Sequence, residues 1–119
     1  MAMSTNLLIA LVALEHLWFA TLEIFLWRKP LGLKAFQQTA ESAEKTAVMA
    51  MNQGLYNAFL ASGLIWSLLA EPPFSFHLKL FFLGCVAAAG IFGAMTALRQ
   101  ILWIQGVPAI LALIFLFLS

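Results

Sequence analysis

The 119 residues are 64% hydrophobic and only 9% charged, and the mean hydropathy is +0.99. Soluble domains are roughly half apolar and a quarter charged, so this composition excludes an ordinary soluble domain and favours an integral membrane protein. The net charge of +1 provides no basic patch, which excludes nucleic acid as a partner.

Four apolar stretches are long enough to cross a bilayer, which takes about 20 residues each. They leave no stretch over for a soluble domain. We therefore expect an all-α protein whose single domain, residues 1–119, is an integral membrane four-helix bundle. Its helices are predicted over 4–27, 40–70, 76–98 and 100–118.

The first predicted helix carries Glu15, His16 and Glu23 inside its apolar run. A charged side chain near the bilayer centre costs at least ~2.5 kcal/mol, so such residues usually face the bundle interior and mark a functional site. His16 and Glu23 are seven positions apart and share one helix face, with Glu15 on its flank. All three are candidate proton-transfer groups. Alternatively, Glu15 and His16 balance one another, and Glu23 reaches toward Arg28 or Lys29 at the interface.

Two tryptophans of the same helix, Trp18 and Trp27, are candidate ligand contacts. Trp27 lies one turn beyond Glu23, and Trp18 lies beside the acid at the midplane. The competing interpretation is that tryptophans anchor helices at the membrane interface.

The basic residues predict the orientation of the chain, because Lys and Arg concentrate in cytoplasmic loops. Five of the six fall in the connections 28–48 and 98–100, and Lys79 is the sixth. We therefore expect these two connections in the cytoplasm and both termini outside. Pro30 and Gly32 should end the first helix, so that a short connector lies at the interface.

The second helix is expected to extend into the cytoplasm. Thr39 or Ser42 can act as its N-cap, and Glu41 with Lys45 forms an i,i+4 pair. A helix over 40–70 is roughly 45 Å long, so its first two turns stand in water.

Amides and a phenol on the second and fourth helices complete the candidate site. Gln53 and Asn57 are i,i+4 neighbours, Tyr56 is i+4 from Asn52, and Gln105 lies on the fourth helix. These residues and Glu23 fall in the cytoplasmic half of their helices, which predicts one cavity open to the cytoplasm. The alternative is that they only hold helices together, through hydrogen bonds of ~0.6 kcal/mol each.

Small residues dominate the third helix, and a proline interrupts the fourth. The small-xxx-small spacing lets helix backbones approach closely, either within the bundle or between two copies in a homo-oligomer. Pro108 should kink the fourth helix. The small residues are Gly84, Ala88, Ala89, Gly90, Gly93, Ala94 and Ala97.

No metal or cofactor is expected. One histidine and two carboxylates in the first helix lack a second histidine or HExxH spacing, and there is no P-loop, nucleophile elbow or dinucleotide fingerprint. The single cysteine, Cys85, cannot form an intrachain disulfide.

Several strings together resemble a known family over nearly the whole chain. They are ALEH at 13–16, Glu23 with Trp27, NQGLYNAFLASGLIW at 52–66, FFLGCVAAAGIFGA at 81–94 and QGVPAILAL at 105–113. They resemble the small integral membrane family catalogued as domain of unknown function 1304. The resemblance implies a multi-pass protein of the cell membrane, in a bacterium the inner membrane, and supplies no activity. It places Glu15, His16, Glu23, Asn52, Gln53, Asn57 and Gln105 in the family's characteristic strings.

A looser similarity of pattern is to the four-helix membrane bundle of sterol isomerases, which implies that Glu15, His16 or Glu23 moves a proton on a lipid-like substrate. Our leading hypothesis is a membrane-embedded pocket, open to the cytoplasm, that binds a small amphipathic or lipid-like molecule. The alternatives are a proton-transfer enzyme of the isomerase kind, a proton-coupled transporter and a purely structural membrane subunit.

Overall fold

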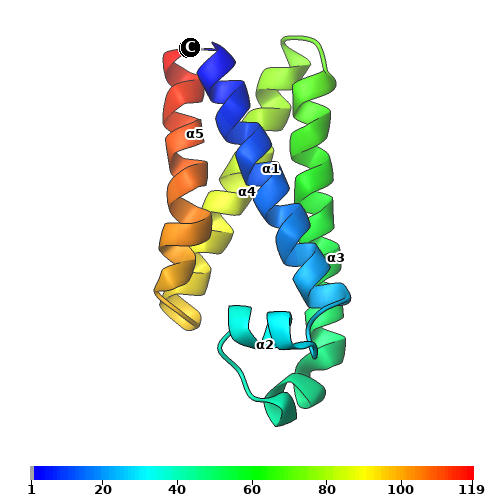
Figure 1. Cartoon of the computed structure of the whole chain (residues 1–119). Coiled ribbons are helices and arrows are strands. Elements are labelled where there is room, and N and C mark those ends of the chain that lie inside the picture. The colour runs from blue at the N-terminus through cyan, green and yellow to red at the C-terminus, as the bar shows by residue number, and fades with distance from the viewer. Residues whose placement is uncertain (1) are drawn as a thin grey trace. The chain divides into compact units, whose positions relative to one another are not determined.

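The computed structural model describes residues 2–119, and over this range it contains five α-helices and one π-helical segment (Figure 1). The all-α prediction is confirmed, but the expected count of four helices was wrong. The connector after the first helix forms a helix of its own, and the last predicted helix is divided. The elements are α1 (Ala2–Ile24), α2 (Pro30–Ala35), α3 (Ala40–Leu69), α4 (Phe74–Thr96), η1 (Leu102–Gly106) and α5 (Val107–Leu118).

The short helix α2 begins with the residue that was expected to break helical structure. Lys29 is its N-cap, in an extended conformation, and Pro30 occupies the first turn. A proline there loses no hydrogen bond and has a φ suited to a helix. Gly32 lies inside α2, where a Cβ atom would clash with the carbonyl oxygen of Leu26. Glycine therefore allows α2 to approach the end of α1, which stops at Ile24, three residues earlier than predicted.

The long helix α3 matches its predicted range of 40–70 to within one residue. The Ser42 amide donates to Thr39 Oγ1 at 3.1 Å, so Thr39 and not Ser42 is the N-cap. The expected i,i+4 pair is present, with Lys45 Nζ at 3.3 Å from Glu41 Oε1. Local capping chemistry therefore determines where this helix begins.

The fourth predicted helix changes its winding just before Pro108. Over Leu102–Gly106 the backbone widens into η1, and the Val107 amide donates to the carbonyl of Leu102, five residues back. Proline has no N–H and its ring crowds the preceding turn, so a regular α-helix cannot pass through it unchanged. The expected distortion at Pro108 thus appears as the π-helical segment η1, which directly precedes α5.

The chain consists of two compact units. The large unit holds residues 2–14 and 60–119. In it α4 packs against η1 and α5 (Figure 1). A Cβ atom on Gly90 would lie 2.5 Å from the Cα of Gly106, so the two backbones touch where both residues are glycine. The buried core of this unit consists of Ile9, Val12, Ala13, Leu64, Leu83, Val86, Ala87, Ala109 and Ala112.

The small-residue stripe of α4 is used in part within the large unit. Besides the contact of Gly90 with Gly106, a Cβ atom on Gly93 would lie 2.8 Å from Ile101 Cγ2. At Gly84, in contrast, no described atom lies within 4 Å of the added Cβ position. Close packing within the chain therefore explains the C-terminal part of the stripe, and a homo-oligomer through its other part stays a prediction.

The small unit, residues 15–59, contains the end of α1, helix α2 and the first two thirds of α3. A Cβ atom on Gly54 would lie 2.5 Å from Ile24 Cγ1 and 3.2 Å from the Ala20 carbonyl oxygen. Glycine at this position allows α3 to lie directly against α1. This contact sets which face of α3 meets α1.

Among the described residues, α1 and α4 are long and apolar enough to cross a membrane, with 23 residues each. The segment Leu102–Leu118 is also apolar, but it is shorter. The composition and these two helices agree with a membrane protein.

Candidate functional site

The small unit holds a buried carboxylate beside an amide. Glu23, in the last turn of α1, is only 5% exposed. The half-buried Asn57 of α3 donates from Nδ2 to Glu23 Oε1 at 2.5 Å. Asn57 follows Gly54 by three positions and therefore lies on the face of α3 that meets α1. The close helix contact at Gly54 is what brings this pair together.

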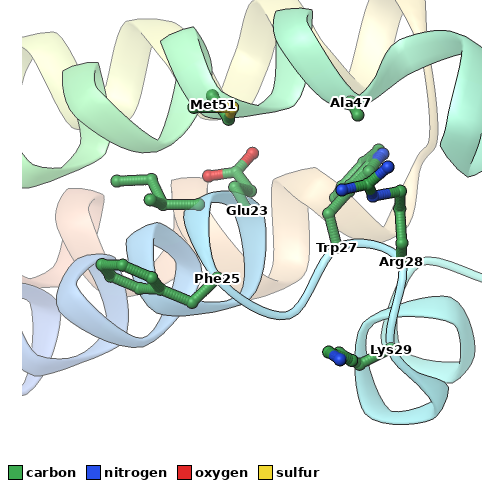
Figure 2. A pocket seen from close by; sticks show the side chains of 8 residues that line it. Glu23, Phe25, Trp27, Arg28, Lys29, Ala47 and Met51 are labelled. Carbon is green, nitrogen blue, oxygen red and sulfur yellow. The ribbon is translucent and has the colours of Figure 1, made fainter.

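A hollow of about 100 Å³ adjoins this carboxylate, and we call it the Glu23 pocket (Figure 2). In Figure 2 the Glu23 carboxylate points toward Met51 of α3, while Trp27 and Arg28 lie next to Ala47. The lining combines one carboxylate, two cations, two aromatic rings and aliphatic side chains. It consists of Glu23, Ile24, Phe25, Trp27, Arg28, Lys29, Ala47 and Met51.

Two contacts to α3 hold the segment that forms one side of the pocket. Trp27 donates from Nε1 to Thr46 Oγ1 at 3.2 Å, and its ring packs on Phe36 with centroids 4.8 Å apart. Arg28 donates from Nη1 to both carboxylate oxygens of Glu44, at 3.0 and 3.2 Å. The ion pair is exposed and contributes at most about 1 kcal/mol, so the Trp27 contacts contribute most to fixing this segment.

The other two ionisable residues of α1 lie outside the pocket lining. His16 is fully buried, and its ring meets that of Phe19 edge to face at 5.6 Å. Glu15 is half-buried, and within residues 2–119 its buried Oε1 has no hydrogen-bond partner. The structure thus places His16 and Glu23 on the buried face of α1, and only Glu23 at the pocket.

Of the predicted ligand contacts, Trp27 lines the pocket. Asn57 donates a hydrogen bond to Glu23, whose carboxylate lines the pocket. Trp18, Gln53 and Tyr56 are exposed, Tyr56 to 65%, and do not line it. Asn52 donates to the Val48 carbonyl of its own helix at 3.1 Å. Gln105 is half-buried and belongs to the large unit.

Several lining residues were not among the predicted ligand contacts. Arg28 and Lys29 were used to predict orientation and as groups toward which Glu23 could reach, but not as ligand contacts, although their position directly after Glu23 and Trp27 was a signal for a charged pocket rim. Phe25, Ala47 and Met51 carry no such signal, because apolar residues are everywhere in this chain. Within residues 2–119, no group of three or more His, Cys, Asp or Glu side chains could hold a metal ion.

The arrangement offers two kinds of polar contact to a bound molecule. The hydrogen bond from Asn57 engages only Oε1 of Glu23, which leaves Oε2 to accept from a donor in the pocket. Arg28 and Lys29 present cationic donors to an anionic group. Between them lie apolar and aromatic side chains, as in most small-molecule sites.

Comparison with known proteins supports the family resemblance. The family model described as "Protein of unknown function (DUF1304)" matches residues 10–117. The chain is 31% identical over 116 residues to a protein of Lactococcus lactis subsp. lactis (strain IL1403) described as "Uncharacterized protein YpaA". This match covers 96% of the chain and 97% of the relative. No solved structure matches the chain.

Proposed function

We propose, since this chain belongs to the DUF1304 family of proteins of unknown function, that it is an integral membrane protein that binds the polar head of a small amphipathic or lipid-like molecule. The Glu23 pocket is the binding site. The observation that carries the proposal is a buried carboxylate that Asn57 engages through Oε1, beside a hollow whose other charged groups are cations.

Exposed apolar side chains support the membrane part of the proposal. Large aliphatic and aromatic residues stand on the surface of α1, α4 and α5, where water would make their exposure costly and lipid would not. In the proposed orientation the basic connection after α1 is cytoplasmic, so the pocket opens at the cytoplasmic side. The exposed residues include Leu7, Leu11, Leu14, Phe92, Met95 and Phe117.

The size of the pocket supports binding of a head group and not of a whole ligand. Sites for drug-sized molecules occupy roughly 300–1,000 Å³, and this pocket has about 100 Å³. An apolar tail would therefore remain outside. Phe25, which is 72% exposed, and Met51 offer it apolar surface beside the pocket.

Native mass spectrometry of the full chain, extracted in a mild detergent, tests the proposal. We expect the wild type to retain a non-covalently bound small molecule that is lost in Glu23→Gln. Glu41→Gln is the matched control, because Glu41 is an exposed carboxylate on α3 outside the pocket. A wild type that carries nothing, or a Glu23→Gln variant that retains the molecule as the control does, would contradict the proposal.

A second candidate function is proton transfer, as in an isomerase, on a lipid-like molecule that reaches Glu15 and His16, which lie outside the Glu23 pocket. It is supported by Glu15, whose buried Oε1 lacks a hydrogen-bond partner among the described residues, next to the buried His16. Isomerisation of an isoprenoid or sterol-like substrate would then collapse in Glu15→Gln or His16→Ala while binding survived. Equal turnover in these variants and the wild type would exclude it.

A further inference from the structure

We infer that the ligand is a zwitterionic phospholipid whose head group carries a primary ammonium and a phosphate. The ammonium would lie in the Glu23 pocket, the phosphate at Arg28 and Lys29, and the tails outside. This inference rests on the proposed function and specifies the chemistry of its ligand.

The surroundings of Glu23 favour binding of a cation that carries an N–H group. Its partner is the neutral amide of Asn57, and neither ion pair among the described residues includes Glu23. Burying a carboxylate without a cation is costly, so a ligand that brings a positive charge gains most at this site. A primary ammonium also donates a hydrogen bond to Oε2, whereas a quaternary ammonium has no N–H to donate.

Arg28 and Lys29 favour binding of an anion at the rim of the Glu23 pocket. Lys29 is exposed and belongs to neither ion pair of the described residues. Arg28 uses Nη1 for Glu44, which leaves the donors on Nη2 and Nε. Arginine and lysine are the residues that bind phosphate oxygens through charge-assisted hydrogen bonds.

The balance of charge favours a zwitterion over an anion. The charges of Arg28 and Glu44 balance one another in their ion pair, so with Glu23 ionised the pocket and this neighbouring carboxylate together carry two negative and two positive charges. A lipid with net negative charge would meet the Glu23 carboxylate without a compensating group. A zwitterion matches both ends of the site, because its positive group can lie at Glu23 while its negative group lies at Arg28 and Lys29.

Depth and volume set the direction of entry. Glu23 is buried within the protein and Lys29 is exposed, so the ammonium would lie deeper inside the protein than the phosphate. About 100 Å³ corresponds to roughly three water volumes, which suffices for the terminal part of a head group. The glycerol and tails then remain in the bilayer, which distinguishes a lipid from a soluble phosphate ester.

The test compares head groups on the full-length protein in detergent. Native mass spectrometry measures binding of phosphatidylethanolamine, phosphatidylcholine and phosphatidylglycerol with identical acyl chains. We expect the ethanolamine lipid to bind about tenfold more tightly than the other two, the ratio expected for one charge-assisted hydrogen bond. Soluble glycerophosphoethanolamine, added at the same concentration, should leave lipid binding unchanged.

Matched variants assign the preference to the two ends of the site. Glu23→Gln should bring the ethanolamine lipid to within about twofold of the choline lipid, and Lys29→Gln should weaken all three lipids together. Glu41→Gln and Lys45→Gln are the controls, since both residues are exposed on α3 and lie outside the pocket lining. They should leave the head-group ratio as in the wild type.

The outcomes separate this inference from the proposed function. Equal binding of the three lipids, preference for the glycerol lipid, or full competition by soluble glycerophosphoethanolamine would overturn the inference. Retention of an amphiphile that is not a phospholipid, lost in Glu23→Gln, would overturn it while the proposed function stands. Absence of any bound amphiphile would overturn both. The wild-type head-group ratio needs no variant, so a variant that fails to fold does not weaken the test.

Discussion

The Glu23–Asn57 pair shows how a carboxylate that is costly to bury is stabilised inside the protein. The carboxylate is almost completely buried and receives a hydrogen bond from an amide on the facing helix. A buried polar group whose partner is removed loses its hydrogen bond and keeps its desolvation cost. Asn57 is therefore expected to matter more for stability than the more exposed polar residues near it in the sequence.

Asn57→Ala should lower the free energy of unfolding by about 1–3 kcal/mol, because it leaves Glu23 buried without its donor. Asn52→Ala is the matched control and should change stability by less than about 0.5 kcal/mol, since the exposed Asn52 amide bonds only its own helix. Thermal unfolding in detergent, followed by circular dichroism, measures both. Equal losses in the two variants would contradict the role given to the pair.

The sequence was sufficient to predict the buried face of α1 but not the face of α3 that meets it. His16 and Glu23 share a face because seven residues complete nearly two turns, and both are buried. On α3 the candidate residues Gln53, Tyr56 and Asn57 do not share one helix face, so the pattern did not predict which face meets α1. The deciding residue was Gly54, whose lack of a side chain permits the helix contact, and Asn57 follows it by three positions.

At the scale of helices, a boundary was predicted correctly where it depends on contacts between residues close in the sequence. The start of α3 follows from Thr39, whose side chain caps the helix whatever the rest of the chain does. Prolines were harder, because their effect depends on position. Pro30 begins α2, whereas Pro108 follows a π-helical segment that a general rule for proline kinks does not specify.

Two glycines of α4 should respond oppositely to the same substitution. Gly90→Ala places a Cβ atom 2.5 Å from the Gly106 backbone, so α4 and η1 must separate. We expect a loss of about 2 kcal/mol or more, the usual cost of overpacking. Gly84→Ala meets nothing within 4 Å and should be neutral or add about 0.5–1 kcal/mol of helix stability.

Thermal unfolding of the two alanine variants in one detergent checks this pair of expectations. Each carries the same chemical change on the same helix, so a difference between them reports the contact with η1 alone. A Gly90→Ala variant as stable as Gly84→Ala would mean that the close approach of the two backbones is absent in the protein.

At the scale of the whole molecule, composition alone predicted the class. The apolar content and the spacing of long apolar stretches led to an all-α protein, and two of its described helices can cross a membrane by length and composition. Orientation rests on the basic residues, five of which lie in two connections. Distances within the chain are the same in either membrane orientation, so the orientation is determined by a measurement in cells.

Cysteine labelling provides that measurement. In a Cys85→Ala background, which removes the single natural cysteine, Glu71→Cys should react with a membrane-impermeant maleimide on intact cells. Ala35→Cys, on the exposed side of α2, should react only after the membrane is permeabilised. The reverse pattern would place the Glu23 pocket at the outer surface, and labelling of both on intact cells would contradict a single orientation.

The two contacts that hold the end of α1 to α3 have a practical consequence. The bonds from Trp27 to Thr46 and from Arg28 to Glu44 close the base of a loop, and its tip includes the exposed Gln37, which has a φ of 51°. Chain inserted at an exposed loop tip is tolerated because few contacts depend on it. A water-soluble carrier domain fused at Gln37 would therefore give this small chain enough ordered mass for single-particle imaging, without touching the side chains that would hold a lipid.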